Sequence, residues 1–458
     1  MTTKISSLCY DDLAVGMTAQ ETRICRADDL FVFANASGNF NPMNLPGDDG
    51  RAEAAAPSMW VASLISAVLG VRLPGPGTLY LSQTLDFIGR ARAGEELTAH
   101  AKLIEKMDGN RVKFETWVDG PEGRVVEGEA VVLAPAQSLT MERGDIPGLT
   151  VQRHVHFDRL LQMAEVLDPI PTAVVAPESP DALAGPILAA QHTLIDPILI
   201  GDPDRIRAEA EKGGLDISAF RIIAEPDHKA AAARAVAMIH SGEAHAVMKG
   251  DLHTDILLGQ VVKSDGGLRV GRRLSHVFVM DVPGLPHLLM ITDAAINIAP
   301  DLPTKVDIIQ NAIDLAHALG IEEPRVAVLS AVEVVNPAIP STLDAAVLSK
   351  MAERGQIRGG LVDGPLAMDN AIDLDAARIK GIQSLVAGRA DILMAPNLEA
   401  GNMIAKELTF LAHAEAGGIV IGAKCPIILT SRADNEKARL ASCAIAALYA
   451  AQKGGLGK

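Results

Sequence analysis

The sequence predicts two domains of different class, an α+β domain with an antiparallel sheet followed by an α/β domain with a parallel sheet. Residues 77–133 contain short runs of alternating polar and apolar side chains, separated by turns such as Asp108-Gly109. Residues 134–151 lose this periodicity and are rich in proline and glycine, which is typical of a linker. Beyond them, short apolar runs alternate with longer helical patterns, which indicates parallel strands joined by helices.

In the first half, one helix is expected to precede four strands. The helix is predicted over residues 58–69, an apolar run with small side chains that the sheet would bury. The strands are predicted at residues 79–88, 97–106, 112–118 and 125–133. We therefore assign the first domain to about residues 8–135 and the linker to residues 136–154.

In the second half, short apolar runs predict the strands of the α/β domain. Those with the strongest pattern are residues 172–176, 197–200, 244–248 and 325–329. Near the C-terminus, residues 425–430 are typical of a buried strand, and residues 436–450 carry apolar side chains at helical spacing.

Composition limits the possible functions. At 458 residues the chain exceeds what one hydrophobic core usually supports, and 48% hydrophobic with 21% charged residues is typical of a globular protein. An aromatic content of 3% argues against a surface that stacks on bases, and a net charge of −16 argues against binding a phosphate backbone. An anionic substrate would therefore need a local basic site.

Cysteine spacing and hydropathy favour a cytoplasmic protein. The cysteines show neither metal-ligand spacing nor a disulfide framework, so we expect reduced thiols at Cys9, Cys25, Cys425 and Cys443. Residues 2–12 lack the apolar core of a signal peptide, and no apolar run is long enough to span a membrane. Neither a nucleotide-binding loop nor a helical zinc motif occurs, so we expect no metal, no membrane and no nucleic-acid partner.

A predicted strand-to-helix turn near the C-terminus contains a hydroxyl, a guanidinium and a carboxylate, those of Ser431, Arg432 and Asp434. The free backbone N–H groups of such a turn attract anions. Arg432 could bind a phosphate through two nitrogens, and Ser431 could donate to a developing oxyanion. Asp434 could accept a proton or only cap the helix, so the turn also fits a purely structural helix start.

An ordered set of motifs from residue 155 onward resembles the phosphate acetyl/butyryltransferase family, closest to its butyryltransferase-like branch. They include Asp196-Pro-Ile-Leu-Ile-Gly201, Val247-Met-Lys249-Gly250, Leu274-Ser275-His276, Thr292-Asp293-Ala-Ala-Ile-Asn297, Val362-Asp363-Gly364-Pro365, Glu399-Ala-Gly401-Asn402 and Thr430-Ser431-Arg432-Ala-Asp434.

The resemblance implies a two-lobed α/β domain over residues 155–458, similar to the isocitrate/isopropylmalate dehydrogenase fold. Lobe one would contain about residues 155–285 and 422–458, and lobe two about residues 286–421. The implied reaction interconverts a short acyl-CoA (acetyl to butyryl) plus phosphate with acyl phosphate plus CoA. Coenzyme A and phosphate would be substrates, no cofactor would be bound, and the protein would be a homo-oligomer.

The same resemblance implies roles for particular residues. Ser431 would bind the tetrahedral intermediate, Arg432 the leaving phosphate, and Asp434 would be the base for the thiol. Further substrate-binding candidates lie mostly at the ends of predicted strands, where α/β sheets place ligands: Lys249, His253, Thr254, Arg272, Ser275, Asp293 and Asn402.

Structural alternatives stay open for several of these candidates. Lys249 could belong to a surface turn, Thr254 could cap a helix, and Asp293 could be an ordinary turn residue. We expect Gly401 to allow close approach of backbone, and His276 to be a core residue.

The first half resembles the MaoC-like hydratases of the hotdog fold, on the basis of residues 10–17, 33–44 and 73–78. That family carries Ser-Gly-Asp-x-Asn-Pro-x-His, and here the Asp and His positions are Asn39 and Asn44. An amide has no titratable proton near neutral pH, so it cannot act as general acid or base. We therefore expect a degenerate hydratase site. The alternatives are a bifunctional enzyme that also hydrates enoyl-CoA, and a non-catalytic acyl-CoA-binding regulatory protein.

Overall fold

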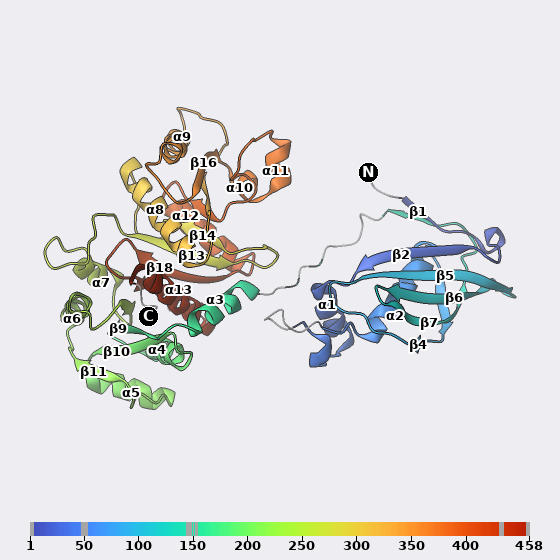
Figure 1. The fold of residues 1–458 in the computed structure, drawn as a ribbon, viewed down its shortest axis with the longest axis horizontal. Coiled ribbons are helices and arrows are strands. Elements are labelled where there is room, and N and C mark those ends of the chain that lie inside the picture. Colours follow the sequence, from blue (N-terminus) through green and yellow to red (C-terminus); the bar gives the residue numbers. More distant parts are fainter. Residues whose placement is uncertain are drawn as a thin grey trace. The chain divides into compact units, whose positions relative to one another are not determined.

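The chain forms two units, each with its own hydrophobic core (Figure 1). The computed structural model describes residues 4–46, 54–142, 149, 151, 154–429 and 435–454. The division falls after Val151, inside the predicted linker, and gives the units Met1–Val151 and Gln152–Lys458.

The N-terminal unit is an antiparallel sheet packed on one long helix. The six-stranded sheet has the order β2-β5-β6-β7-β3, with β4 paired to β7. Its strands are β2 (Thr18–Ile24), β3 (Leu79–Gln83), β4 (Asp86–Phe87), β5 (Glu96–Met107), β6 (Arg111–Gly120) and β7 (Gly123–Leu133). The predicted strands are confirmed, except that residues 79–88 are divided into β3 and β4.

Helix α2 (Ser58–Val71) fills the concave side of this sheet, and its prediction over residues 58–69 is confirmed. Its side chains Trp60, Ile65 and Leu69 share a core with alternate residues of β5, such as Leu97 and Leu103. A central helix covered by an antiparallel sheet is the hotdog arrangement that the resemblance implies. The remaining elements of this unit are α1 (Ala27–Ser37) and the 3-10 turns η1 (Tyr10–Asp12) and η2 (Pro42–Asn44).

A two-stranded ribbon corrects the prediction of a linker without regular structure. Strand β1 (Lys4–Ser6) pairs antiparallel with β8 (Thr140–Glu142), which lies within the predicted linker at residues 136–154. The backbone N–H of Leu139 also donates to Ser7 Oγ at 2.8 Å. A strand of three residues is too short to show periodicity, and its partner is distant in sequence, so only the folded chain reveals it.

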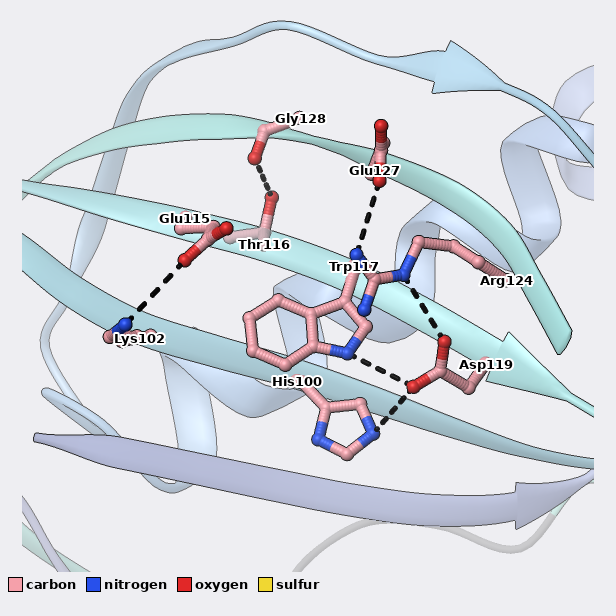
Figure 2. A network of polar contacts seen from close by, with 9 residues as sticks. All are labelled: His100, Lys102, Glu115, Thr116, Trp117, Asp119, Arg124, Glu127 and Gly128. Atoms are coloured by element: carbon pink, nitrogen blue, oxygen red, sulfur yellow. Dashed lines mark hydrogen bonds and ion pairs between the residues drawn. The ribbon is translucent and has the colours of Figure 1, made fainter.

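The outer face of the N-terminal sheet is occupied by a polar network across β5, β6 and β7 (Figure 2). The rings of His100 and Trp117 stack at 4.9 Å between centroids, and the Arg124 guanidinium lies 5.0 Å from the indole. Asp119 accepts hydrogen bonds from Trp117 Nε1 at 3.0 Å and Arg124 Nε at 3.3 Å. Because these groups satisfy one another, the network stabilises the sheet surface and does not present a free binding group.

The C-terminal unit is built on one mixed sheet, with the order β11-β10-β9-β12-β19-β18-β13-β14-β17-β15-β16. The strands are β9 (Ile170–Val175), β10 (Ile195–Gly201), β11 (Arg221–Ala224), β12 (Ala246–Lys249), β13 (Ser275–Asp281), β14 (Leu289–Thr292), β15 (Arg325–Leu329), β16 (Leu361–Leu366), β17 (Ile392–Met394), β18 (Glu415–Ile421) and β19 (Ile427–Ile428). The predicted strands are confirmed, but the expected purely parallel sheet is wrong.

The antiparallel pairs lie at the centre, where β18 pairs with both β19 and β13, and β13 pairs with β14. The connections from β18 to β19 and from β13 to β14 are short loops, which can join antiparallel neighbours but not parallel ones.

Helices cover both faces of this sheet. One face carries α3 (Val155–Glu165), α4 (Pro180–Gln191), α8 (Leu302–Ala318), α9 (Pro340–Glu353) and α13 (Glu436–Gly454), whose side chains share a core with Leu199, Val277 and Ile428. The other face holds two cores, one beneath α6 (His228–Ser241) and α7 (Thr254–Val261), the other beneath α10 (Met368–Ile372), α11 (Leu374–Ile379) and α12 (Leu398–Phe410). Helix α5 (Pro203–Gly213) lies beside β11 at the sheet edge (Figure 1).

Gly250 directly follows β12, and the backbone at the end of β9 lies very close to it. A Cβ atom there would lie 2.3 Å from the carbonyl oxygen of Ala176, whereas at Gly259 in α7 nothing lies within 4 Å. We predict that Gly250→Ala lowers the free energy of unfolding of the C-terminal unit by about 1–3 kcal/mol through overpacking. Gly259→Ala, the matched control, should raise it by about 0.5–1 kcal/mol because it removes a helical glycine.

The measurement is urea unfolding of the full chain by circular dichroism. Fluorescence provides an internal reference, since Trp60 and Trp117 both lie in the N-terminal unit. Equal stabilities for the two variants would contradict the prediction.

Candidate active site

The predicted catalytic residues Ser431, Arg432 and Asp434 lie outside the described residues. The strand that leads to them is described: β19 pairs parallel with β12, with Val247 opposite Ile427 and Met248 opposite Ile428. The chain therefore leaves β19 at the same edge of the sheet, and next to the same strand end, as Lys249.

The end of β12 is held rigidly against the end of β9. The backbone N–H of Gly250 donates to Val175 O at 2.8 Å, and that of Asp251 donates to Ala176 O at 2.6 Å. Lys249 is half-buried, and its Nζ donates to the carbonyl oxygen of Gly250 at 3.2 Å. A lysine on a fixed backbone at the carboxyl end of a parallel strand is well placed to meet an anion.

His253 and Thr254 begin helix α7 on the same loop. His253 is the exposed N-cap residue and makes no side-chain capping bond, and Thr254 is the first helical residue. The alternative of Thr254 as the capping residue is therefore wrong, because the helix begins one residue earlier than that role requires.

Arg272 and Ser275 are both engaged by helix α8. Arg272 Nη1 lies 2.6 Å from the carboxylate of Asp314, and Ser275 Oγ accepts a hydrogen bond from Asn311 Nδ2 at 3.0 Å. The Ser275 residue is fully buried. In this structure the Arg272 charge is thus paired with a carboxylate at the protein surface, and the Ser275 hydroxyl joins a strand to a helix.

Asp293 organises the loop after β14. It is 2% exposed, and its carboxylate accepts hydrogen bonds from the backbone N–H groups of Ala295 (2.9 Å), Ile296 (3.0 Å) and Asn297 (3.1 Å). Asn297 Nδ2 donates to Asp293 Oδ2 and also to Leu274 O at 2.8 Å. With these partners, Asp293 fixes the path of the loop from within.

Asn402 fastens α12 to the same loop, because its Nδ2 donates to Ala294 O at 3.1 Å. The preceding Gly401 is buried, and a Cβ there would lie 2.5 Å from the carbonyl oxygen of Asp293. The predicted close approach of backbone at Gly401 is confirmed. Asn402 is half-buried.

The candidates fall into two groups at opposite edges of the sheet. Strand β14 runs antiparallel to β13, which is parallel to β12, so Asp293 and Asn402 lie at the edge opposite to Lys249. The loop nevertheless returns toward α7, because Ile296 packs against the core that contains Leu257 of α7. The two groups therefore share one face of the sheet.

His276 lies buried on that face, opposite Val420 across the β13–β18 pair, as predicted for a core residue. Its ring meets Phe278 edge-on at 4.3 Å, and its Nδ1 has no hydrogen-bond partner. Burial lowers the pKa of His276 from 6.5 to about 4, against the opposing effect of the Asp293 charge. At neutral pH the imidazole is therefore uncharged.

Two buried cysteines near the C-terminus are poor candidates for a nucleophile. Burial raises the pKa of the Cys425 and Cys443 thiols to about 12, so both stay protonated and are poor nucleophiles. Across residues 4–46, 54–142 and the later described ranges, no group of three His, Cys, Asp or Glu side chains could hold a metal ion. No described helix is long and apolar enough to cross a membrane.

In the N-terminal unit, Asn39 and Asn44 line one cavity of about 300 Å³ beside the first turn of α2. Asn44 Nδ2 donates to Ala55 O at 2.8 Å, and Asn39 Oδ1 accepts from the backbone N–H of Asn41 at 3.3 Å. The two positions of the hydratase motif are thus brought together, with amides in place of acid and base. Arg90, a lining residue of this cavity, was missed in the sequence because no motif surrounds it.

The pKa of His276 generates a prediction on acid stability. Between about pH 6.5 and 4 the unfolded chain binds a proton at this residue and the folded chain does not, so stability falls as pH decreases through this window. His276→Gln keeps a polar side chain of similar size without titration. Between pH 7 and 5, we expect the melting temperature of His276→Gln to fall less than that of the unmodified protein. The difference should correspond to about 1–3 kcal/mol in free energy of unfolding. Parallel pH profiles of the two proteins would argue against it.

Comparison with known proteins places the C-terminal unit. Residues 227–447 match the family model "Phosphate acetyl/butaryl transferase". The phosphate acetyltransferase of Rhizobium meliloti is 58% identical over 297 residues, which is 65% of this chain and 94% of that protein. The phosphate butyryltransferase of Clostridium acetobutylicum is 47% identical over 265 residues, which is 58% of this chain and 88% of that protein.

Solved structures match both parts of the chain. A branched-chain phosphotransacylase from Enterococcus faecalis V583 is 29% identical, with a TM-score of 0.54, and the match covers 61% of this chain and 99% of that one. R-Hydratase PhaJ1 from Pseudomonas aeruginosa is 35% identical over 33% of this chain and 100% of that one, with a TM-score of 0.32. Because the match covers nearly the full length of the Rhizobium meliloti relative, this chain belongs to the phosphate acetyl/butyryltransferase family.

Proposed function

We propose that this protein is a phosphate acyltransferase that interconverts a short acyl-CoA plus phosphate with acyl phosphate plus CoA. The observation that carries the proposal is 58% identity to a phosphate acetyltransferase over 94% of its length. The geometry is consistent with it, because the ends of β12 and β19 bring Lys249 and the start of the Ser431 segment to one edge of the sheet.

The reaction requires an ionised thiol, a polarised carbonyl and a bound phosphate. From the chemistry of their side chains and the resemblance of this segment to the family, we assign the oxyanion contact to Ser431, the phosphate contact to Arg432 and the proton acceptor to Asp434. Lys249 supplies a second cation at the adjacent strand end. In the direction of thioester synthesis, the thiolate attacks the carbonyl carbon, the C–O bond to phosphate breaks, and the proton of the thiol passes to the base.

We further propose that the substrates lie on the face of the sheet that carries α6, α7 and α12, between two lobes. The two cores on this face are separate, one beneath α6 and α7, the other beneath α12. The loop of Asp293 reaches from the second core to the first through Ile296. Asp293 and Asn402 would then act on the substrate by positioning this loop.

Hydration of enoyl-CoA is a poorer proposal for the same chain. The cavity in the N-terminal unit has Asn39 and Asn44 where the hydratase motif has its acid and base. Amides can orient a water molecule but cannot exchange a proton with it near neutral pH.

The direct test is turnover by the purified full chain. With acetyl, propionyl and butyryl phosphate plus CoA, we expect thioester formation matched by release of phosphate. The chain length that gives the highest kcat/KM would identify the acyl group. A folded protein that turns over none of the three would refute the proposed function and favour an acyl-CoA-binding regulatory role.

Substitutions at the two central positions should give different kinetic signatures. Ser431→Ala should lower kcat by about 10²–10³-fold with little change in KM, because its hydrogen bond forms mainly in the transition state. Arg432→Ala should raise KM for acyl phosphate and also lower kcat, since a phosphate is bound in both states.

Arg378→Ala, which removes an exposed arginine of α11, serves as the control. Equal, modest losses in the Ser431 and Arg432 variants together with lower melting temperatures would favour a structural helix start in place of catalytic roles.

A further inference from the structure

The cavity of the N-terminal unit is lined by hydrogen-bond donors that have no partner among the residues that the structure describes. Asn39 and Asn41 use their amide oxygens to accept backbone N–H groups, those of Asn41 at 3.3 Å and Met43 at 3.1 Å. Within the described residues, the NH₂ groups of both amides are left unbonded. An unbonded amide NH₂ at a cavity wall is available to an acceptor on a ligand.

Ser58 and the first turn of α2 add further donors to the same wall. Helix α2 follows Pro57, which provides no side-chain cap, and Ser58 is one of the residues that line the cavity. The polar part of the lining therefore includes a serine as well as the asparagines.

A guanidinium completes this wall and gives the cavity a positive charge. Arg90 lines the cavity, is exposed, and has no ion pair or hydrogen bond among the described residues. Other arginines of this unit are paired: Arg23 with Asp29, and Arg72 with Glu21 at 2.7 Å. No described lining residue is acidic. An unpaired arginine in a wall without carboxylates favours an anionic ligand.

The rest of the cavity is apolar and small. Its walls include the side chains of Met43, Ala56, Val61 and Val125, and its volume is about 300 Å³. This volume is at the lower end of the range for small-molecule sites, about 300–1,000 Å³. The apolar part thus fits a chain of a few carbons beside the polar wall.

We propose that this cavity binds a short acyl chain that ends in an anionic group, as in an acyl phosphate or a free carboxylate. The guanidinium of Arg90 and the NH₂ groups of Asn39 and Asn41 contact the anionic end, and the apolar walls contact the chain. Because no described lining residue can exchange a proton near neutral pH, the site holds its ligand without converting it. An acyl phosphate is a substrate of the proposed transfer reaction, so this second site would sense that compound.

The test is hydrogen exchange of the full chain with butyryl phosphate, butyrate, butyryl-CoA or inorganic phosphate, read separately on peptides from each unit. We expect butyryl phosphate, butyrate or both to protect residues 54–61 and 86–91, and the comparison of the two identifies the anionic group. Arg90→Ala and Asn39→Asp should weaken this protection at least 10-fold in ligand concentration, the latter by placing a like charge beside the ligand. Arg111→Ala and Asn110→Asp make the same changes at the turn from β5 to β6, away from the cavity, and should leave it unchanged.

Acyl transfer is assayed on the same preparations. Protection by butyryl-CoA alone, by inorganic phosphate alone, or by no compound would overturn this inference. If acyl transfer proceeds although the expected protection is not seen, the proposed function stands without the second site. If acyl transfer fails while the expected protection is seen, only the proposed function is lost.

Discussion

The parallel pairing of β12 with β19 is the constraint on which the C-terminal unit depends. Strand β19 is almost at the end of the chain, yet it lies between β12 and β18 at the centre of the sheet. It joins the parallel strands of one half to the antiparallel β18 and β13, and through them to the other half. The chain therefore leaves β19 at the junction of the two halves of the sheet. Gly250 belongs to the same constraint, because the backbone of β9 leaves no space for a side chain there.

Much of this fold could be predicted from the sequence because the local patterns are strong. The period-two alternation of residues 97–106 gave β5 to within one residue at each end, since the side chains of one face all enter one core. The strand directions at the centre of the C-terminal sheet could not be predicted in this way. A buried strand has the same apolar pattern in either direction, so only the lengths of the connections around β18 and β13 carried the information.

The candidate site was predictable in position more than in side-chain role. Lys249 and Asp293 lie at or directly after strand ends, whereas Asn402, expected at a strand-to-helix corner, lies inside α12, and what each side chain contacts depends on distant residues. The Arg272 guanidinium pairs with Asp314, which lies 42 positions later in the sequence. The Ser275 hydroxyl accepts a hydrogen bond from Asn311, which lies 36 positions later. A sequence motif records that these residue types are needed without recording whether they face a substrate or the protein interior.

The N-terminal cavity keeps the position of a hydratase site but has different side-chain chemistry. Replacing an Asp and a His by Asn39 and Asn44 removes the proton-transfer groups, but the amides retain hydrogen-bonding capacity and satisfy the surrounding backbone. The loss of a carboxylate also leaves Arg90 without a competing negative charge in the described wall. A hydratase pocket needs a carboxylate as general base to activate water, whereas the negative charge of that carboxylate weakens the binding of an anion. Amides at these two positions therefore suit the anionic ligand that we propose for this cavity.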